Sequence, residues 1–532
     1  MVHDRGSGIG GSGGPSQDPA RADRTSEARF RVGGVAVAVA LVVAGAVCLV
    51  QSARLPATTR VQVVGKDRAV EPAATDPLVV TAQNSPVVVA DPTDANHLVV
   101  ASRVDLPGFA CGVRVSFNGG STWRETPVPA SGACFAPDVA FGPDGTLVVA
   151  FTVLSARAAP ATVPDSLWVV SSGDGGRTFG VPVMASGPLA FQARLTADPV
   201  RPGRLFLTWV QAAATSGFGF ASTDNPILVS RSEDGGVTWS QPGRVAPAAR
   251  SRVVAPVPLS TAEGGLVVAY LDVGDDRLDY SGAHGGRGGE PYPGRWQLVV
   301  ARSADGGRTW NESVADGGVT PTQRFLQLFP PTPSLAADGR RLYLAMADGR
   351  GGDPDVWLWR STDGGGSWAA PRRVNDTALH DGRTQHLPAL AVAPGGRLDV
   401  VYYDRRHDPG DVLGEVSLQS SFDHGRRFTP PVRVSDQAFD SRRGLGSERG
   451  MADLGSRLAV VSTARGALAV WSDTRHAAPG LDKQILVQAV VAVSRSAPDG
   501  RVPLGVAGVV ALAGGVGLLG SQARRRPRAV PT

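Results

Sequence analysis

Cysteine, methionine and lysine are scarce in this chain of 532 residues, which has three cysteines, four methionines and lysine only at Lys66 and Lys483. Three cysteines exclude the framework of several disulfides that stabilises small secreted domains. No cysteines or histidines have the spacing of a zinc site, and we expect His380 and His386 to be solvated loop residues. The sequence also lacks an EF-hand loop and a Gly-x-Ser-x-Gly motif. We therefore predict no bound metal and no cofactor.

A large excess of charge of one sign is absent from the central part of the chain. The net charge of +5 is carried by the two ends, because residues 1–31 contain five arginines against four acidic residues and the last residues add four arginines. The body between the ends is neutral. Nucleic-acid-binding domains carry a clustered basic surface, so we predict no nucleic-acid partner.

Long apolar runs without charge occur at 32–50 and at 502–520. Each is near 19 residues, which is long enough for a helix to cross a bilayer. Arginines precede the first run and follow the second, so the positive-inside rule predicts that both ends are cytoplasmic and the region between them extracytoplasmic. A cleaved signal at the first run is an alternative.

These runs define the predicted organisation of the chain. We expect a disordered cytoplasmic tail at 1–31, a transmembrane helix at 32–50, a linker at 51–76, one large repeat domain at 77–493, a linker at 494–501, a second transmembrane helix at 502–520 and a basic cytoplasmic tail at 521–532.

The central region contains six copies of an eight-residue pattern, Ser-x-Asp-x-Gly-x-Thr-Trp, at intervals of 56 to 71 residues. Two examples are Ser172-Gly-Asp-Gly-Gly-Arg-Thr-Phe179 and Ser303-Ala-Asp-Gly-Gly-Arg-Thr-Trp310. Asp-Gly and Gly-Gly between β-branched runs predict hairpins, because glycine readily adopts the positive φ of tight turns. A repeat of this length, with one such turn per period, is typical of units that bury their faces against each other.

Each period also opens with a hairpin, so a unit has four strands, which is the size of a propeller blade. The opening hairpin occurs seven times, and its last copy ends at Ala467–Trp471. The seventh unit has a third strand at Gln484–Gln488 but no eight-residue pattern after it. We expect the spare strand Pro77–Thr81 to fill the fourth place and close the ring. The predicted fold is an all-β propeller of four-stranded antiparallel blades, with seven blades favoured over six.

The eight-residue pattern resembles the Asp-box, or BNR repeat, of sialidases and related propellers. The resemblance covers about residues 77–493 and implies that the boxes are structural and lie on the face away from any active site. The residues at the Asp position are Asn118, Asp174, Asp234, Asp305, Asp363 and Asp423.

Cys111 and Cys134 lie in the predicted first blade, in a compartment where thiols oxidise if the topology is correct. We predict that they form a disulfide. Two unpaired cysteines are the alternative.

Polar residues follow the second strands, where loops from several blades meet around the central channel. Asp348 and Arg350, Asp404 with Arg405 and Arg406, and Asp473 and Arg475 occupy the same place in three blades. In one interpretation each Asp-x-Arg is a local device at the end of a strand. In the other, the guanidinium groups of Arg350, Arg405, Arg406 and Arg475 face a common centre and bind a carboxylate or sulfate, with Asp348 and Asp473 beside them.

The resemblance to sialidases adds a possible catalytic set, since those enzymes use three arginines, a tyrosine nucleophile with a glutamate partner, and an aspartate as acid and base. By position, the candidates here are Tyr403 or Tyr402 as nucleophile and Asp404 or Asp272 as acid and base. We predict a membrane-anchored extracytoplasmic propeller that recognises a glycan or an envelope protein. An exo-sialidase type of glycoside hydrolase is the alternative, and whether the protein is an enzyme stays open.

Overall fold

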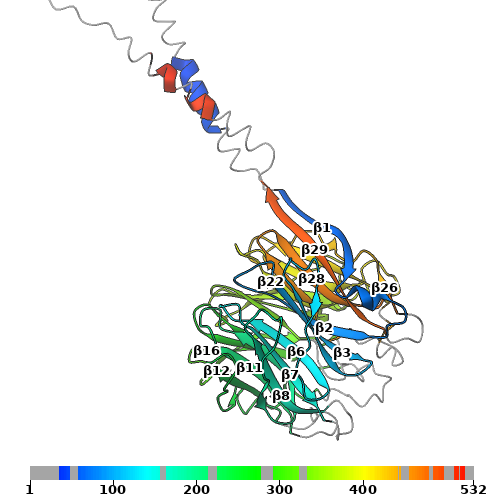
Figure 1. Cartoon of the computed structure of the whole chain (residues 1–532). Coiled ribbons are helices and arrows are strands. Elements are labelled where there is room, and N and C mark those ends of the chain that lie inside the picture. Colours follow the sequence, from blue (N-terminus) through cyan, green and yellow to red (C-terminus); the bar gives the residue numbers. More distant parts are fainter. Residues whose placement is uncertain are drawn as a thin grey trace, which may run out of the picture. The chain divides into compact units, whose positions relative to one another are not determined.

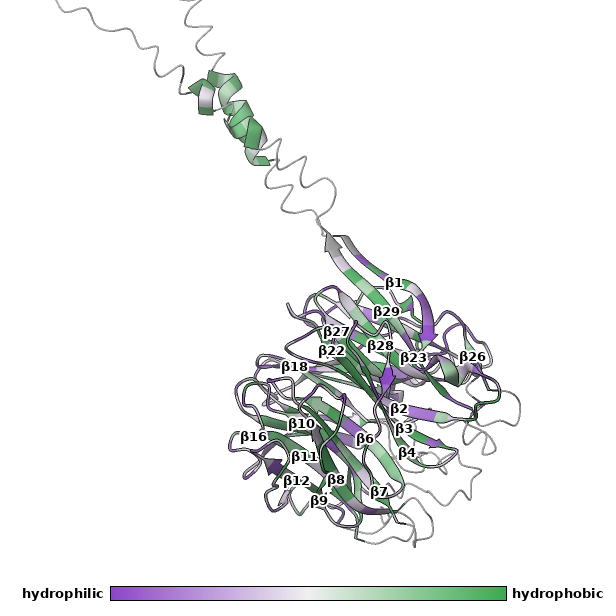
Figure 2. Cartoon of the chain, in the orientation of Figure 1, coloured by the Kyte–Doolittle hydropathy of each residue, from purple (hydrophilic) through white to green (hydrophobic). Residues whose placement is uncertain are grey.

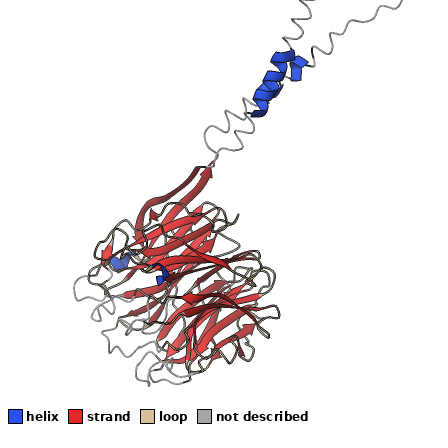
Figure 3. Ribbon diagram, turned by 180° about the vertical axis from the view of Figure 1, so that it is seen from behind, coloured by secondary structure: helices blue, strands red, loops and turns tan. Residues whose placement is uncertain are grey.

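The computed structural model describes residues 35–47, 58–155, 163–213, 224–276, 292–322, 332–440, 442–444, 454–477, 483–496, 509–513, 516–519 and 521. Residues 61–494 form one compact unit that contains the propeller, and the two terminal segments form another. Residues 58–496 contain every described strand (Figure 3), so this stretch carries a complete core of its own.

The terminal unit contains short helices at 35–47, 509–513 and 516–519. Within the parts of the chain that are described, no helix has both the length and the apolar character needed to span a bilayer. The two transmembrane helices expected at 32–50 and 502–520 are therefore not found, and parts of both runs, including Cys48, lie outside the described residues.

The described strands form seven antiparallel sheets, six of four strands and one of five, which confirms the seven-bladed propeller (Figure 1). Blade 1 consists of β2 (Ala82–Ala90), β3 (Leu98–Leu106), β4 (Ala110–Ser116) and β5 (Arg124–Glu125). Blade 2 consists of β6 (Cys134–Phe141), β7 (Leu147–Leu154), β8 (Pro164–Ser172) and β9 (Val183–Ser186). Blade 3 consists of β10 (Ala190–Ala197), β11 (Leu205–Gln211), β12 (Ile227–Ser232) and β13 (Gly243–Arg244). Strands such as β7 and β11 are buried over most of their length and are mainly hydrophobic (Figure 2).

The remaining blades repeat this plan. Blade 4 consists of β14 (Val253–Ser260), β15 (Leu266–Asp272), β16 (Trp296–Ser303) and β17 (Asn311–Val319), and blade 5 consists of β18 (Ser334–Asp338), β19 (Arg341–Asp348), β20 (Asp355–Ser361) and β21 (Ala369–Arg373). Blade 6 consists of β22 (Gln385–Val392), β23 (Leu398–Asp404), β24 (Leu413–Ser421), β25 (Val432–Arg433) and β26 (Phe439–Asp440). Blade 7 consists of β27 (Ala459–Thr463), β28 (Gly466–Asp473), β29 (Ile485–Ser496) and β1 (Thr58–Ala69). Two 3-10 helices, η1 (Pro72–Thr75) and η3 (Gly349–Gly351), lie in connections. The first strands of neighbouring blades contact each other around a closed ring.

The strand that closes the ring is β1, not the predicted Pro77–Thr81. Residues 77–81 form a turn and an irregular segment, and β1 lies in what was expected to be a linker at 51–76. β1 pairs with β29, which completes blade 7 with strands from both ends of the domain (Figure 1). Turn residues at 77–81 leave too few paired positions for a blade strand, whereas β1 spans 12 residues.

The two ends of each blade define two faces of the propeller. In blade 4, Leu266 of β15 pairs with Ser303 at the start of an Asp-box, and Asp272 at the other end pairs with Gln297. The box turns and the strand-end aspartates therefore lie on opposite faces, as predicted. We call them the box face and the loop face.

Each Asp-box turn is held by its own side chains. In the fourth copy, the Asp305 carboxylate accepts hydrogen bonds from the Ser303 hydroxyl (2.8 Å), the Thr309 amide (2.9 Å) and the Thr309 hydroxyl (2.6 Å), and the Gly307 amide donates to Ser303 Oγ (2.7 Å). The corresponding bond from the Thr238 hydroxyl lowers the pKa of Asp234 to about 2. The boxes are structural, as the resemblance implied.

The boxes also join neighbouring blades. Thr126 of blade 1 donates its hydroxyl to the Gly176 carbonyl of the next box (2.7 Å), and Ser313 does the same to Gly365 (2.6 Å). Blade 7 has no box in its sequence, and a different contact holds its seam with blade 6. There the buried Arg397 guanidinium donates to the Thr463 and Gly466 carbonyls (both 2.9 Å).

The predicted disulfide is confirmed, with an S–S distance of 1.92 Å between Cys111 and Cys134. Its place differs from the expectation, because Cys134 opens β6 and so belongs to blade 2. The bond therefore links two blades rather than two strands of one blade.

We predict that the Cys111→Ala/Cys134→Ala variant of residues 58–496 loses about 3 kcal/mol of unfolding free energy, because a loop with a sequence separation of 23 is no longer closed in the unfolded chain. Denaturant unfolding of wild type with and without reductant checks this. A midpoint that reductant leaves unchanged in the wild type contradicts it.

Candidate functional site

The predicted strand-end aspartates are structural acceptors on the loop face. Asp348, Asp404 and Asp473 have no exposed surface and end β19, β23 and β28. Burial raises the pKa of Asp348, and the hydrogen bonds and positive charge of Arg350 oppose that rise. A carboxylate without solvent contact needs such partners to remain ionised.

The arginine of each Asp-x-Arg is shared by two carboxylates. Arg350 binds Asp348 (2.6 Å) and Asp316 of the preceding blade (2.7 Å). Arg406 likewise binds Asp404 (2.5 Å) and Asp376 (2.7 Å), and Arg475 binds Asp473 (2.7 Å) and Asp67 (2.8 Å). Each set of one arginine and two carboxylates thus has a net negative charge. The arginine of each set has its ion-pair partners within the protein. This geometry fits the local interpretation, in which each arginine pairs near its own strand end.

Arg405 follows a different course. Its Nη1 donates to the Asp411 carbonyl (2.9 Å) and lies 3.4 Å from the Asp411 carboxylate, within a loop of the same blade.

The candidate nucleophiles are enclosed in the core. Tyr403 and Tyr402 have no exposed surface, and Tyr403 Oη donates to the Ser472 carbonyl (2.9 Å) and accepts from the Ser472 amide (3.1 Å). Burial raises the pKa of both tyrosines well above the usual value. His386, expected to be solvated, is instead buried and stacked on Tyr403, with ring centres 5.2 Å apart. These tyrosines offer no accessible hydroxyl in this conformation.

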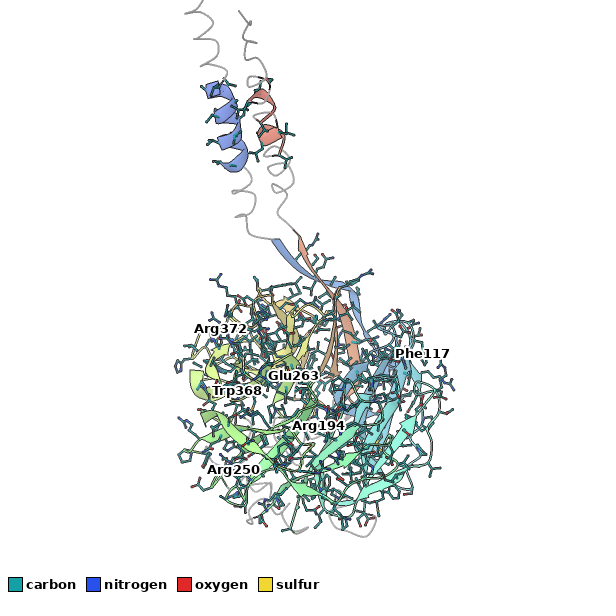
Figure 4. All side chains as sticks on the ribbon, turned by 90° about the vertical axis from the view of Figure 1, so that its left-hand side faces the viewer. Phe117, Arg194, Arg250, Glu263, Trp368 and Arg372 are labelled. Carbon is teal, nitrogen blue, oxygen red and sulfur yellow. A yellow bond between two sulfur atoms is a disulfide. The ribbon has the colours of Figure 1, made fainter. Side chains whose placement is uncertain are left out.

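Asp272 belongs to a separate group in blade 4. Arg250, which Figure 4 labels near the edge of the propeller, donates to Asp272 (2.6 Å), Gln297 (2.9 Å) and Glu312 (3.1 Å). Tyr270 donates to Glu312, and its side chain is fully buried. The group contains a tyrosine hydrogen-bonded to a glutamate. The polar side chains of Arg250, Asp272, Gln297, Glu312 and Tyr270 are hydrogen-bonded to one another within the group.

Among the described residues, charges from several blades converge without full compensation at the propeller axis. A bulge with one residue at positive φ recurs in five first strands, at Ser85, Ala136, Gln192, Ala255 and Leu387, and Gly455 has the same positive φ just before the first strand of blade 7. The residue two positions after the bulge is Asp138 in blade 2, Arg194 in blade 3 and Arg457 in blade 7. The repeated bulge therefore carries these three side chains to the same level of the ring.

Arg194 is neutralised at this site, and Arg457 is not. Arg194 Nε lies 2.9 Å from Asp138, whose carboxylate also accepts the Leu195 amide (2.9 Å). Arg457 donates one bond, from Nη2 to the Pro137 carbonyl (3.0 Å), and no carboxylate of the described residues lies within ion-pair distance. Burial and then the positive charge of Arg194 lower the pKa of Arg457 to about 9, and Arg103 contributes to the same shift.

Two hydrogen-bond donors remain without a partner in this group. Arg457 Nε and Gln192 Nε2 are buried and have no acceptor in the described part of the chain. The Gln192 amide orientation follows from its oxygen, which accepts the Ala255 amide (2.7 Å). Both residues line an axial cavity of about 20 Å³ that also includes Ser456, and this is room for roughly one water-sized atom. Unsatisfied donors around a small cavity are complementary to the oxygen of an anion.

Asp138, Arg194, Gln192 and Arg457 were not among the residues predicted from the sequence. A signal was present, because proline follows the bulge residue at Pro86, Pro137, Pro256 and Pro388. Aligning the first strands on this proline places Asp138 at the shared position. Ala193 and Ser456 replace the proline in blades 3 and 7, so this signal does not reveal Arg194 or Arg457. No group of three potential metal ligands occurs among the described residues, so these residues show no candidate metal site.

The chain is similar in structure to several propellers. These include the Hadza microbial sialidase Hz136 (16% identity, 75% of this chain and 74% of that chain, TM-score 0.41) and the GH93 alpha-L-arabinofuranosidase of Fusarium graminearum with arabinobiose (16%, 68% and 93%, 0.39). YCF48 bound to D1 peptide is also similar (10%, 83% and 96%, 0.41).

No family model and no curated protein matches the chain. The resemblance to sialidase-type propellers is thus confirmed as a similarity of structure. At these identities and TM-scores it carries no argument about activity.

We predict that Tyr403→Phe lowers the unfolding free energy by about 1–3 kcal/mol, because two buried groups of Ser472 lose their partner. Tyr343→Phe is the control, since its hydroxyl has a single long contact of 3.4 Å with His424. Equal stability losses in the two variants by denaturant unfolding contradict the structural role of Tyr403.

Proposed function

We propose that this propeller recognises an extracytoplasmic ligand through an anionic group, a carboxylate or sulfate of a glycan, that enters the axis from the loop face. The observation that carries the proposal is Arg457, which no carboxylate of the described residues neutralises and whose Nε lies on the same cavity as Gln192 Nε2, both without an acceptor in the described part of the chain.

The electrostatics of the axis favour a ligand over a purely structural role. A buried cation without a counterion destabilises a fold, because desolvation costs free energy that no ion pair offsets. Buried ionisable groups with a strongly shifted pKa are typical of binding and catalytic sites. An anion would supply two acceptors for the free donors and would raise the pKa of Arg457 by stabilising its charged form.

The cavity also limits the size of the group that enters. About 20 Å³ accommodates one oxygen of a terminal anion and excludes a polymer segment. The ligand would therefore present an anionic end group, with further contacts to the loops around the axis.

The exo-sialidase alternative needs an accessible tyrosine beside carboxylates near this cavity. Tyr402, Tyr403 and Tyr270 are all buried, and the half-buried Tyr292 donates its hydroxyl to Asp275. The described geometry therefore supports binding more strongly than glycoside hydrolysis, and turnover of a fluorogenic sialoside by residues 58–496 would favour the enzyme.

We predict that N-acetylneuraminate, glucuronate or sulfate raises the melting temperature of residues 58–496, and that Arg457→Met removes this effect with at least a tenfold loss of affinity, as expected for charged hydrogen bonds. Without an anion, Arg457→Met should melt at the same temperature as wild type or higher, because it removes a buried charge. Calorimetry and thermal unfolding measure both quantities.

The pH dependence provides the control for this prediction. The folded pKa of about 9 lies below the normal arginine value of 12.5, so the fold disfavours the charged form, and this destabilisation is relieved as pH rises through 9. Anion affinity should fall over the same range in wild type. Affinity that is equal in wild type and Arg457→Met, or independent of pH from 7 to 10, contradicts the site.

We also propose that the apolar runs at 32–50 and 502–520 anchor the propeller to a membrane. The support is their length and lack of charge in the sequence, together with the pairing of β1 and β29, which brings both ends of the domain to one place. The disulfide is consistent with an oxidising compartment outside the cytoplasm.

We predict that the full chain stays in the membrane fraction after alkaline carbonate washing and is released by detergent, whereas residues 58–496 are released without detergent. Fractionation followed by immunoblotting checks this. Release of the full chain by carbonate contradicts the proposed anchoring.

A further inference from the structure

An arginine precedes the box serine in three consecutive blades, at Arg231, Arg302 and Arg360. In blade 3 this arginine has a counterion within its own box. Arg231 Nε lies 3.0 Å from Glu233, which also binds Arg204 at 2.9 Å. Blade 3 therefore shows how the repeat neutralises an arginine at this position.

Blade 5 lacks that counterion. The position of Glu233 is occupied by Thr362, and no carboxylate of the described residues lies within ion-pair distance of Arg360. The Nε atom of Arg360 is buried without a hydrogen-bond partner. Ala304 replaces the glutamate in blade 4 in the same way, but there the exposed Glu263 lines the pocket beside Arg302.

Two more arginines converge on Arg360 in the seam between blades 5 and 6. Arg372 of β21 pairs with Leu358, two positions before Arg360 on the same face of the sheet. Arg426 follows Gly425 of the sixth box, and a Cβ placed on Gly425 would lie 3.0 Å from Arg360 Cδ. Burial and the charges of Arg372 and Arg426 lower the pKa of Arg360.

The acidic groups around this seam do not neutralise it. Asp423 accepts hydrogen bonds from Ser421 and from the Arg426 and Arg427 amides, and so serves the box turn. Arg372, Arg426 and Arg427 are exposed. Asp338, the next carboxylate, lies 3.8 Å from His424 and 3.9 Å from Arg341. Among the described residues, the seam therefore presents the guanidinium groups of Arg360, Arg372, Arg426 and Arg427, while Asp423 and Asp338 bind other partners.

This seam lies on the face from which both ends of the domain leave. β29 starts opposite Asp473 on the loop face, passes Gly466 at the box face with Ala492, and continues to Ser496.

The distance to the apolar runs is short. Seven residues, 51–57, separate the first run from β1, and five residues, 497–501, separate β29 from the second. Extended chains of these lengths span at most about 25 Å and about 18 Å. If the runs enter a bilayer, the box face is held close to the lipid headgroups, where electrostatic attraction acts over about a Debye length.

We propose that Arg360, Arg372 and Arg426 bind the phosphate groups of anionic lipids, so that the box face rests on the membrane and the axial site faces away from it. The inference rests on the proposed anchoring for its choice of partner. Guanidinium groups bind phosphate through paired hydrogen bonds, and each cation near an anionic surface contributes about 1 kcal/mol.

The test uses residues 58–496, which lack both apolar runs, and cosedimentation with vesicles. The protein should bind vesicles that contain phosphatidylglycerol, in a salt-sensitive manner, and should not bind phosphatidylcholine vesicles. Thr362→Glu, which copies the counterion of blade 3, should weaken binding about fivefold, and Thr362→Gln, of the same size without charge, should bind as wild type does.

Several results would overturn the proposal. These are equal binding to both vesicle types, equal affinity of the Glu and Gln variants, or inhibition by inorganic phosphate at concentrations that leave vesicle binding by other basic proteins intact, which would indicate a site for free phosphate. Binding to a soluble acidic polysaccharide but not to vesicles would assign the surface to a different partner. Carbonate extraction of the full chain tests only the anchoring by the apolar runs. A negative result there is therefore distinguishable from a negative result for lipid binding at Arg360 in the vesicle experiment.

Discussion

The pairing of β1 with β29 is the contact on which the rest of this structure depends. A blade buries both faces only when it has two neighbours, and the first and last blades are neighbours only if the ring closes. The seam at this point joins residues that are far apart in the chain. The Trp123 ring nitrogen donates to Gln488 (3.1 Å), and Arg68 donates to the carbonyl of Gly120 (2.7 Å). The amide of Ser456 donates to the Ser85 hydroxyl (3.0 Å) beside the axis. Loss of the closing strand would therefore disturb the axial cluster as well as the outer edge of blade 7.

Arginine has two distinct roles in this protein, and the balance of carboxylates around each guanidinium separates them. Arg350, Arg406 and Arg475 each lie between two carboxylates and hold loops and blades together. Arg457 and Arg360 each have a buried Nε without a hydrogen-bond partner and no carboxylate within ion-pair distance among the described residues. Since an unpaired buried charge costs stability, these two positions are where a ligand contributes most. The two proposed sites lie toward opposite faces, with the loop face assigned to an anionic end group and the box face to an extended anionic surface.

The sequence predicted the architecture well, because every repeat carries its own turn chemistry. Six Asp-boxes required six hairpins with glycine at positive φ, and their spacing required four strands per unit. The number of blades followed from the count of opening hairpins in the same pattern. The closing strand was misplaced because β1 carries no motif, and a run of β-branched residues at 77–81 matched a strand equally well. A local sequence pattern does not show which of two such segments pairs with the unpaired edge of β29 in blade 7.

The amino-acid sequence by itself determined that this chain forms a ring of four-stranded blades with its box turns on one face, because those properties depend on residues close together in the chain. Only the tertiary structure decided which charges are neutralised. Arg475 meets Asp67 and Arg457 meets Pro137 across hundreds of residues, so their partners depend on ring closure and on the bulges that set the depth of each side chain. For the same reason the buried partners of the predicted aspartates and tyrosines, and the axial site that we propose, could not be predicted from the sequence.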